Sequence, residues 1–420
     1  MGWQPLLTGA LKDKALERAR ALLHTLPAPA ASDQPGASLS AGAAGLAVSM
    51  AVAAQGGHCE RAAELAAAHL DAAIEVLASR RFSLSLYSGF TGIGWAANLV
   101  DRLLPGAAAD RCDEIDTALA SAVWRYPDLG PYDLIDGLAG LGSYALARWP
   151  RGAAADCLVG ILRQLARRAR PGADGSCYWW TDSETLIGPR QQLYPEGGVD
   201  AGVAHGMAGL LPLLARSCSA GVCESTMRPL LDGAVRWLLA HLVDSPAGRT
   251  MPSFIAPGTE PVPARSAWCY GDPGVAVALM LAGRDLDEPQ WLQAGIELGL
   301  RAGRRLPEQS GVTEAGICHG AAGLAHLFLR MYQLTSAEEL AGAEELAAAA
   351  TFWIDRTLAM TSQIPGREAD PRQARWRGPG LLEGSAGIAL VLLAACEPAE
   401  PVWDQMLLTS TGLPDPVHAR

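Results

Sequence analysis

Two kinds of helical segment alternate along the chain. One kind carries its charges on a single face, as in residues 289–306 (PQWLQAGIELGLRAGRRL), where apolar residues recur at three or four positions. This period is typical of an amphipathic helix on a protein surface. The other kind is almost uncharged, as in 275–282 (VAVALMLA) and 388–395 (IALVLLAA). A helix that is apolar on every side has to be buried on every side.

A G-x-x-G element precedes each of the apolar segments. It occurs seven times along the chain, with first glycines at Gly42, Gly89, Gly137, Gly206, Gly271, Gly320 and Gly384. A motif repeated in this way indicates a repeat architecture. We therefore predict an all-α fold, a double-layered α/α toroid of seven inner and seven outer helices. An open solenoid is the alternative, but it requires polar terminal repeats, and the last apolar segment is as apolar as the others.

Three long connections interrupt the helical pattern but show no repeat or helical period of their own. We expect residues 1–420 to form a single domain with long irregular insertions near 171–204, 244–266 and 361–380, each rich in Gly, Pro and polar residues. Long irregular segments in compact domains are commonly functional. The first insertion contains the aromatic run 177–180 (CYWW), which either contacts a peptide or fills a hydrophobic gap. We favour the second interpretation.

Composition and charge exclude several classes of protein. Hydrophobic residues make up 50% of the chain and charged residues 18%, which excludes a disordered chain. The formal net charge of -11 argues against a nucleic-acid partner, because binding phosphates needs a basic surface. The sequence contains no secretion signal and no apolar run of the ~18 residues that a transmembrane segment needs. The nine cysteines are scattered and do not make a disulfide framework, so we expect a reduced, cytoplasmic protein.

Candidate metal ligands lie next to two of the glycine elements. Cys269 stands two residues before Gly271, and Cys318 and His319 stand directly before Gly320. If the copies are equivalent, the three side chains lie at the same end of neighbouring repeats. Two thiolates and an imidazole are ligands that zinc favours, and three protein ligands leave the fourth position open, as in catalytic zinc sites. The cysteines within helical patterns are expected to be core residues.

Other polar residues occupy similar places and form a candidate proton-transfer set. His205 directly precedes Gly206, and Asp133 lies just before Gly137. Arg265 and Tyr270 flank Cys269. For Asp133 and Arg265, a helix cap or an ion pair is an equally good interpretation. Tyr270 either donates a hydrogen bond or only packs.

These motifs together resemble the lanthionine synthetase C family of peptide cyclases. The resemblance covers nearly the whole chain and rests on YDLIDGLAG from Tyr132, AHGMAGLLPLL from Ala204, SAWCYGDPG from Ser266, GICHGAAGLAHL from Gly316 and LLEGSAGIAL from Leu381. It implies an α/α ring whose zinc is held by the residues that match Cys269, Cys318 and His319. It also implies that a cysteine thiol is added to dehydroalanine or dehydrobutyrine in a precursor peptide, giving lanthionine or methyllanthionine.

The resemblance further implies proton-transfer roles for His205, Asp133, Arg265 and Tyr270. The sequence shows no large additional N-terminal region like that of the fused two-function enzymes, so we expect a separate dehydratase to supply the peptide. We also expect a transporter as a partner, with which the enzyme could form a peripheral complex at the membrane. The residues present suit this reaction. A thiol that coordinates zinc loses its proton, and the thiolate can then attack the alkene. The enolate formed by this addition has to be protonated by an acid. We expect His205 to be that acid or base, with Asp133 orienting it and Arg265 holding the enolate oxygen or the peptide. Two rival functions are a prenyltransferase-like zinc enzyme, which would use a carboxylate ligand, and a non-catalytic scaffold with a structural zinc, which would use four Cys or His ligands.

Overall fold

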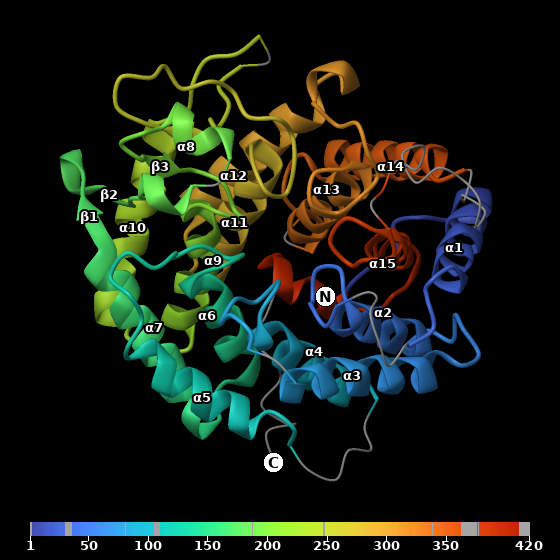
Figure 1. Ribbon diagram of the computed structural model, residues 1–420. Coiled ribbons are helices and arrows are strands. Elements are labelled where there is room, and N and C mark those ends of the chain that lie inside the picture. Colours follow the sequence, from blue (N-terminus) through green and yellow to red (C-terminus); the bar gives the residue numbers. More distant parts are fainter. Residues whose placement is uncertain are drawn as a thin grey trace. The chain divides into compact units, whose positions relative to one another are not determined.

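The computed structural model divides the chain into two compact units. It describes residues 2–410 except 30–35, 80, 105–109, 187, 247, 338, 363–375 and 377. Unit 1 comprises Met1–Cys112 and Leu306–Trp403, and unit 2 comprises Asp113–Arg305 and Asp404–Arg420. Each unit consists mainly of helices (Figure 1). That residues 1–420 form a single domain stays a prediction.

Unit 1 packs its apolar helices beside one another and covers them with amphipathic ones. Neighbouring inner helices follow the order α4 (Phe90–Leu103), α2 (Ala43–Gln55), α15 (Ser385–Cys396) and α13 (Ala321–Ala337). The outer helices α3 (Ala62–Ser79), α1 (Gly9–His24) and α14 (Ala343–Met360) pack on α2, α15 and α13. Every residue of α15 is buried, whereas α1 buries a single stripe of residues: Ala15, Ala19, Leu22 and Leu23. The predicted alternation of buried and amphipathic helices is present in this unit.

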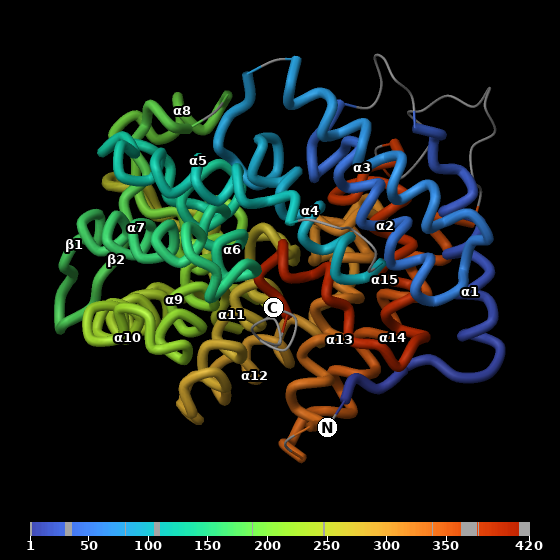
Figure 2. The backbone as a smooth tube through the Cα atoms, turned by 90° about the horizontal axis from the view of Figure 1, so that it is seen from below, coloured from blue at the N-terminus to red at the C-terminus, as the bar shows by residue number. Residues whose placement is uncertain are grey.

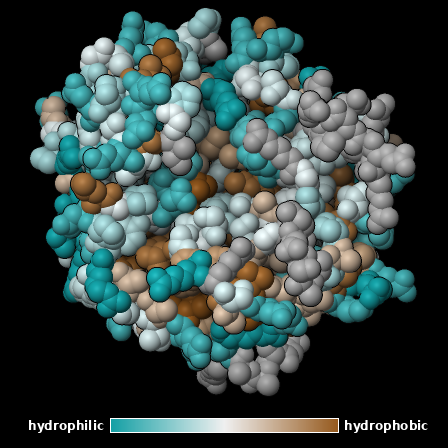
Figure 3. Space-filling model, in the orientation of Figure 1, coloured by the Kyte–Doolittle hydropathy of each residue, from teal (hydrophilic) through white to brown (hydrophobic). Residues whose placement is uncertain are grey.

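Unit 2 has the same two kinds of helix. Its inner helices are α6 (Leu138–Arg148), α9 (Leu210–Ser219) and α11 (Asp272–Asp285), which lie side by side in this order (Figure 2). Its outer helices are α5 (Asp113–Val123), α7 (Gly152–Arg168), α10 (Glu224–Ala240) and α12 (Pro289–Gly303). Over the described residues, the two units together contain the seven inner and seven outer helices that we predicted. Hydrophilic side chains gather over the outer helices α3 of unit 1 and α5 of unit 2 on the face shown in Figure 3.

Short strands order the first two insertions, both of which belong to unit 2. Strand β1 (Ala169–Pro171) pairs antiparallel with β2 (Cys177–Trp179), with Ala169 opposite Trp179. Strand β3 (Val199–Asp200) of the first insertion pairs with β4 (Phe254–Ile255) of the second. The first insertion also holds η1 (Ala173–Gly175), η2 (Ser183–Thr185) and the short helix α8 (Pro189–Leu193). Most of the third predicted insertion, residues 363–375 and 377, lies outside the described residues.

The aromatic run of the first insertion is partly a core element. Trp179 is fully buried, and its indole nitrogen donates a hydrogen bond to the carbonyl oxygen of Leu165 at 2.9 Å. Trp180 instead lies beneath the guanidinium of Arg170, 5.0 Å from the ring centroid. Trp179 therefore fills the space between the insertion and α7, while Trp180 lines a cavity in unit 2.

Six of the seven inner helices follow a tight turn that leaves no room for a side chain at the second glycine: Gly45, Gly92, Gly209, Gly274, Gly323 and Gly387. In unit 1, a Cβ added at Gly323 would overlap the carbonyl oxygen of Ile317. The first helical N–H groups find partners in the same turn, as when the N–H of Ala321 donates to the carbonyl oxygen of Glu314 at 2.9 Å. Helix N-termini otherwise leave such donors unsatisfied. Glycine is required here because backbone approaches backbone.

Neighbouring turns are joined by backbone hydrogen bonds at one register position, two residues before the first glycine. In unit 1, the N–H of Cys318 donates to the carbonyl oxygen of Leu382 at 3.1 Å, and the N–H of Leu382 donates to Ser40 at 2.9 Å. In unit 2, Ile135 donates to Ala204 at 3.3 Å and Ala204 donates to Cys269 at 3.4 Å. Within each unit, equivalent residues of successive repeats therefore meet at one end of the inner helices.

No helix in the part of the chain that the structure describes is long and apolar enough to cross a bilayer.

The close contact at Gly323 predicts that a side chain there lowers the free energy of unfolding. Gly323→Ala should destabilise the protein by about 1–3 kcal/mol, because the added methyl group forces the turn of Ile317 away from α13. Gly152→Ala is the matched control, since a Cβ there meets nothing within 4 Å. Thermal melting followed by circular dichroism compares the two variants. Equal melting temperatures for Gly323→Ala and the wild type would show that the turn tolerates a side chain.

Candidate active site and metal ligands

The chemically active residues share register positions relative to the glycine elements. His205, Tyr270, His319 and Glu383 each directly precede the first glycine of an element. Cys269 and Cys318 each lie one residue further back. Because the turns of a unit share one backbone arrangement, His205 and Tyr270 emerge at the same end of unit 2. By the same argument, His319 and Glu383 emerge at the same end of unit 1.

The structure brings His205 and Asp133 together in unit 2. Nδ1 of His205 lies 2.8 Å from Oδ2 of Asp133, and Oδ1 of Asp133 accepts a hydrogen bond from the N–H of Asp136 at 2.7 Å. The backbone bond holds the carboxylate, and the carboxylate in turn holds the imidazole. The His205 side chain is 40% exposed against 11% for Asp133, so the imidazole is the member of the pair that a substrate can reach.

The surroundings of His205 favour its protonated form. Burial by itself would lower the pKa of His205, but the hydrogen bond and charge of Asp133 raise it, with smaller contributions from Asp200 and Asp136. The net effect is a pKa above the ordinary value of histidine. Burial and the adjacent Asp133 also raise the pKa of Asp136. A histidine with a raised pKa can carry a proton near neutral pH, as a general acid must.

Tyr270 belongs to a hydrogen-bonded group that sequence reasoning found only in part. Its hydroxyl donates to Oδ2 of Asp200 at 3.0 Å and accepts from Nη1 of Arg190 at 2.6 Å. Nη2 of Arg190 also donates to Oδ2 of Asp200 at 2.9 Å. The Asp200 side chain is 1% exposed, and burial raises its pKa although Arg190 opposes the shift. Burial also raises the pKa of Tyr270, so its hydroxyl stays protonated.

Asp200 and Arg190 are the two residues of this group that we did not predict. A signal for Asp200 was available, because it lies six residues before Gly206, the position that Arg265 occupies before Gly271. Arg190 carried no such signal, since it lies in α8, within an insertion that has no repeat register.

Arg265 is placed differently from the other predicted residues. Its side chain is exposed, and it forms no hydrogen bond or ion pair with the described residues of unit 2. The guanidinium that reaches Tyr270 in the structure is that of Arg190. A role for Arg265 in proton transfer or substrate binding stays a prediction.

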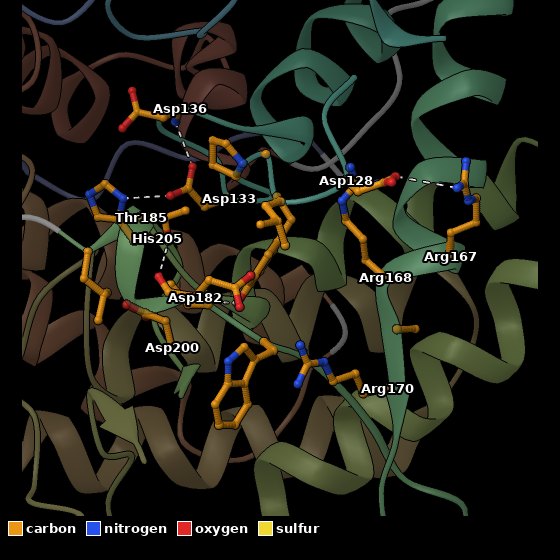
Figure 4. Close-up of a pocket in the computed structure, with 18 of the residues that line it drawn as sticks. Asp128, Asp133, Asp136, Arg167, Arg168, Arg170, Asp182, Thr185, Asp200 and His205 are labelled. Carbon is orange, nitrogen blue, oxygen red and sulfur yellow. Dashed lines mark hydrogen bonds and ion pairs between the residues drawn. The ribbon is translucent and has the colours of Figure 1, made fainter. Parts of the chain in front are cut away.

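A cavity of about 620 Å³ opens beside His205 within unit 2. Asp133 and His205 line one end, and Arg168 and Arg170 line the other (Figure 4). This volume lies in the range of sites that bind small molecules. The cavity therefore gives a substrate access to the exposed imidazole.

Two of the predicted metal ligands lie in unit 1 and one in unit 2. Cys318 and His319 are adjacent, and Nδ1 of His319 is buried without a hydrogen-bond partner among the described residues. A buried imidazole nitrogen is normally satisfied, so this atom suits a metal ion, as does the thiol beside it. Cys269, at the register position of Cys318, is a buried residue of unit 2. The donor types, two sulfurs and an imidazole nitrogen, fit zinc.

The Asp133 contact predicts a change in the titration of His205. Replacing Asp133 by Asn removes the charge that raises the pKa of His205, so this pKa should fall and the histidine should lose its proton at a lower pH. NMR titration of the His205 ring signals measures the change. Asp182→Asn, in the same cavity, is the control. An unaltered His205 pKa in Asp133→Asn would rule out this electrostatic coupling.

The sequence matches a known protein family and a curated relative. Residues 33–408 match a family model described as "Lanthionine synthetase C-like protein". Nisin biosynthesis protein NisC of Lactococcus lactis subsp. lactis is 24% identical over 279 residues, which make up 62% of this chain and 60% of that protein. The matched region therefore spans less than two thirds of this curated relative.

A solved structure of a nisin cyclase has the same fold. It superposes with a TM-score of 0.68 at 19% sequence identity, covering 95% of this chain and 96% of the other. This likeness confirms the predicted fold class, an all-α toroid built from inner and outer helices. The family match also extends from the first glycine element to the last. The chain belongs to the lanthionine synthetase C-like protein family.

Proposed function

We propose that this protein is a zinc-dependent peptide cyclase that adds cysteine thiols to dehydroalanine or dehydrobutyrine and so forms lanthionine or methyllanthionine rings. The observation that carries the proposal is the His205–Asp133 pair, which lines a cavity of about 620 Å³. Family membership and the nisin cyclase relatives support the same chemistry.

The metal has a donor set that suits the reaction. Cys269, Cys318 and Nδ1 of His319 would hold zinc, with one coordination position left for the substrate thiol. Bound there, zinc would supply the deprotonation that turns the thiol into a nucleophile. A site with two protein thiolates is electron-rich, which keeps an incoming sulfur reactive.

The chain's own residues handle the proton that the addition requires. Attack of sulfur on the alkene β-carbon leaves an enolate, whose Cα has to be protonated. Because Asp133 holds Nδ1 of His205, the Nε2 atom is left to deliver that proton. Asp133 acts through His205 and is a positioning residue.

Arg190 is the candidate donor for the developing negative charge, and Tyr270 and Asp200 hold its guanidinium in place. Donors held in place in advance of the reaction stabilise an enolate oxygen without reorganising. Arg190 lines the cavity and presents a guanidinium that Asp200 and Tyr270 already orient. Arg265, which the sequence alone suggested for this task, stays a second candidate.

The substrate implies partners. The peptide has to arrive with its Ser or Thr residues already dehydrated, so we propose a separate dehydratase as the preceding enzyme and a transporter as the next partner. We place all of this chemistry in the reducing cytoplasm, where substrate thiols stay free.

The activity has a direct assay. Incubation with a dehydrated precursor peptide should abolish the peptide's reaction with thiol-alkylating reagents without changing its mass, because the addition joins two parts of one molecule. A prenyltransferase-like enzyme would instead add the mass of its second substrate. If several dehydrated peptides keep all their free thiols, the cyclase proposal is refuted, and the result favours the non-catalytic scaffold with a structural zinc.

Removing a metal ligand should remove the metal. We expect about one zinc ion per wild-type chain by elemental analysis and a large loss of zinc in Cys318→Ala. Cys59→Ala is the matched control, because Cys59 lies outside the glycine elements. Full occupancy in Cys318→Ala would refute the ligand assignment.

The acid is tested separately from the metal. His205→Asn should keep its zinc and lose about 10²–10⁴-fold in cyclisation rate, the usual contribution of a general acid or base. The control is His24→Asn, since His24 is exposed near the end of α1. Cyclisation at the wild-type rate in His205→Asn would assign the proton transfer to another group.

A further inference from the structure

Glu314 contacts the candidate metal ligand His319 from the start of the same turn in unit 1. It lies six residues before Gly320, and its carbonyl oxygen accepts a hydrogen bond from the N–H of Ala321 at 2.9 Å. This bond holds the Glu314 backbone at the beginning of α13. Its side chain turns to the imidazole, and Oε1 of Glu314 lies 2.9 Å from Nε2 of His319.

The contact favours one of the two neutral tautomers of the His319 imidazole. A neutral imidazole carries one N–H and one lone pair, and an ionised carboxylate can only accept. Because Oε1 of Glu314 lies at ion-pair distance from Nε2 of His319, 2.9 Å away, its negative charge favours the N–H on Nε2 and the lone pair on Nδ1. That Nδ1 atom is the buried nitrogen without a hydrogen-bond partner among the described residues.

A second carboxylate lies on the other side of the ring. Oε1 of Glu383 is 4.0 Å from Nδ1 of His319, beyond the usual range of about 2.7–3.2 Å for an N–H···O bond. Glu314, His319 and Glu383 have donor atoms that all lie within 4.8 Å of one another. The shorter distance favours Glu314 as the acceptor, and the reverse arrangement, with Nδ1–H facing Glu383, is an outcome that the experiment can detect.

We propose that Glu314 is a positioning residue for the metal, which holds His319 in the tautomer and orientation whose Nδ1 binds zinc. Ligating histidines commonly donate their other N–H to a carboxylate, which orients the ring and makes the ligand more basic. The proposal rests on the zinc site of the proposed function and assigns this chain a carboxylate that acts on the metal through His319.

Unit 2 uses the same register position in a similar way. Asp200, six residues before Gly206, accepts a hydrogen bond from the Tyr270 hydroxyl. In each unit, a carboxylate six residues before the first glycine of an element contacts a side chain that directly precedes such a glycine. Glu314 contacts His319 in unit 1, and Asp200 contacts Tyr270 in unit 2. The position suits this task because the backbone there is already held against the first turn of the inner helix, as with Glu314.

Zinc affinity measured by competition with a chromophoric chelator tests the proposal without using activity. Glu314→Ala should weaken zinc binding about 10–100-fold, the usual effect of removing such a partner. Glu314→Gln keeps an oxygen acceptor and should lose less. Glu308→Gln is the matched control, because it removes an exposed carboxylate of the same segment and should leave the affinity unchanged. Melting temperatures check that the variants fold.

Two spectroscopic measurements separate the alternatives. In zinc-free protein, nitrogen NMR of the His319 ring should show the Nε2–H tautomer, and Glu314→Ala should shift the population towards a mixture. In Co²⁺-substituted protein, Glu314→Gln should leave the ligand-field bands in place, because Glu314 does not bind the metal itself.

Unchanged zinc affinity in Glu314→Ala, an Nδ1–H tautomer in the wild type, or altered Co²⁺ bands in Glu314→Gln would each overturn the assignment. The tautomer measurement needs no metal, so it tests Glu314 even if the zinc site fails. Tight zinc binding without cyclisation would instead refute the proposed function and leave the role of Glu314 intact.

Discussion

The close approach of backbone to backbone at the start of each inner helix is the constraint on which the remaining structure depends. At the second glycine of an element, the helix lies against a carbonyl oxygen six residues earlier in the chain, as Gly323 lies against Ile317 and Gly209 against Val203. A side chain cannot fit in that space. The turn is therefore short and repeatable, and it places the residues that precede each glycine in the same way from one copy to the next.

The repeated turn converts sequence register into a spatial arrangement within each unit. Residues two positions before the first glycine join neighbouring turns through their backbones, so their side chains are held on a common frame. Residues one position before it include His205, Tyr270 and His319. An apolar inner helix follows every turn, and its burial anchors the frame. Packing that serves stability in this way also positions the chemistry.

The candidate site of unit 2 contains charges that are costly to bury. Asp200 is almost fully enclosed, and removing one partner from a buried ion pair usually costs about 3–5 kcal/mol. Such a pair contributes little net stability, but it holds the Arg190 guanidinium and the Tyr270 hydroxyl in one orientation. The Arg190 guanidinium is thereby held in one orientation beside the cavity that it lines. His205, more exposed than its neighbours, is left free to meet the substrate.

The sequence by itself determined the fold class and the parts of the site that follow local register. Helical period, apolar runs and the glycine turns are properties of short segments, and they are enough to assign His205, Asp133, Tyr270 and the candidate ligands to repeat positions. Only the tertiary structure decided which other groups join them. Arg190 enters from an insertion whose position depends on the pairing of β3 with β4, and Glu314 meets His319 through a side-chain conformation. The position of Glu314, six residues before Gly320, repeats along the chain, but its contact with His319 depends on rotamer choice, and the place of Arg190 depends on long-range pairing; neither can be read from the sequence.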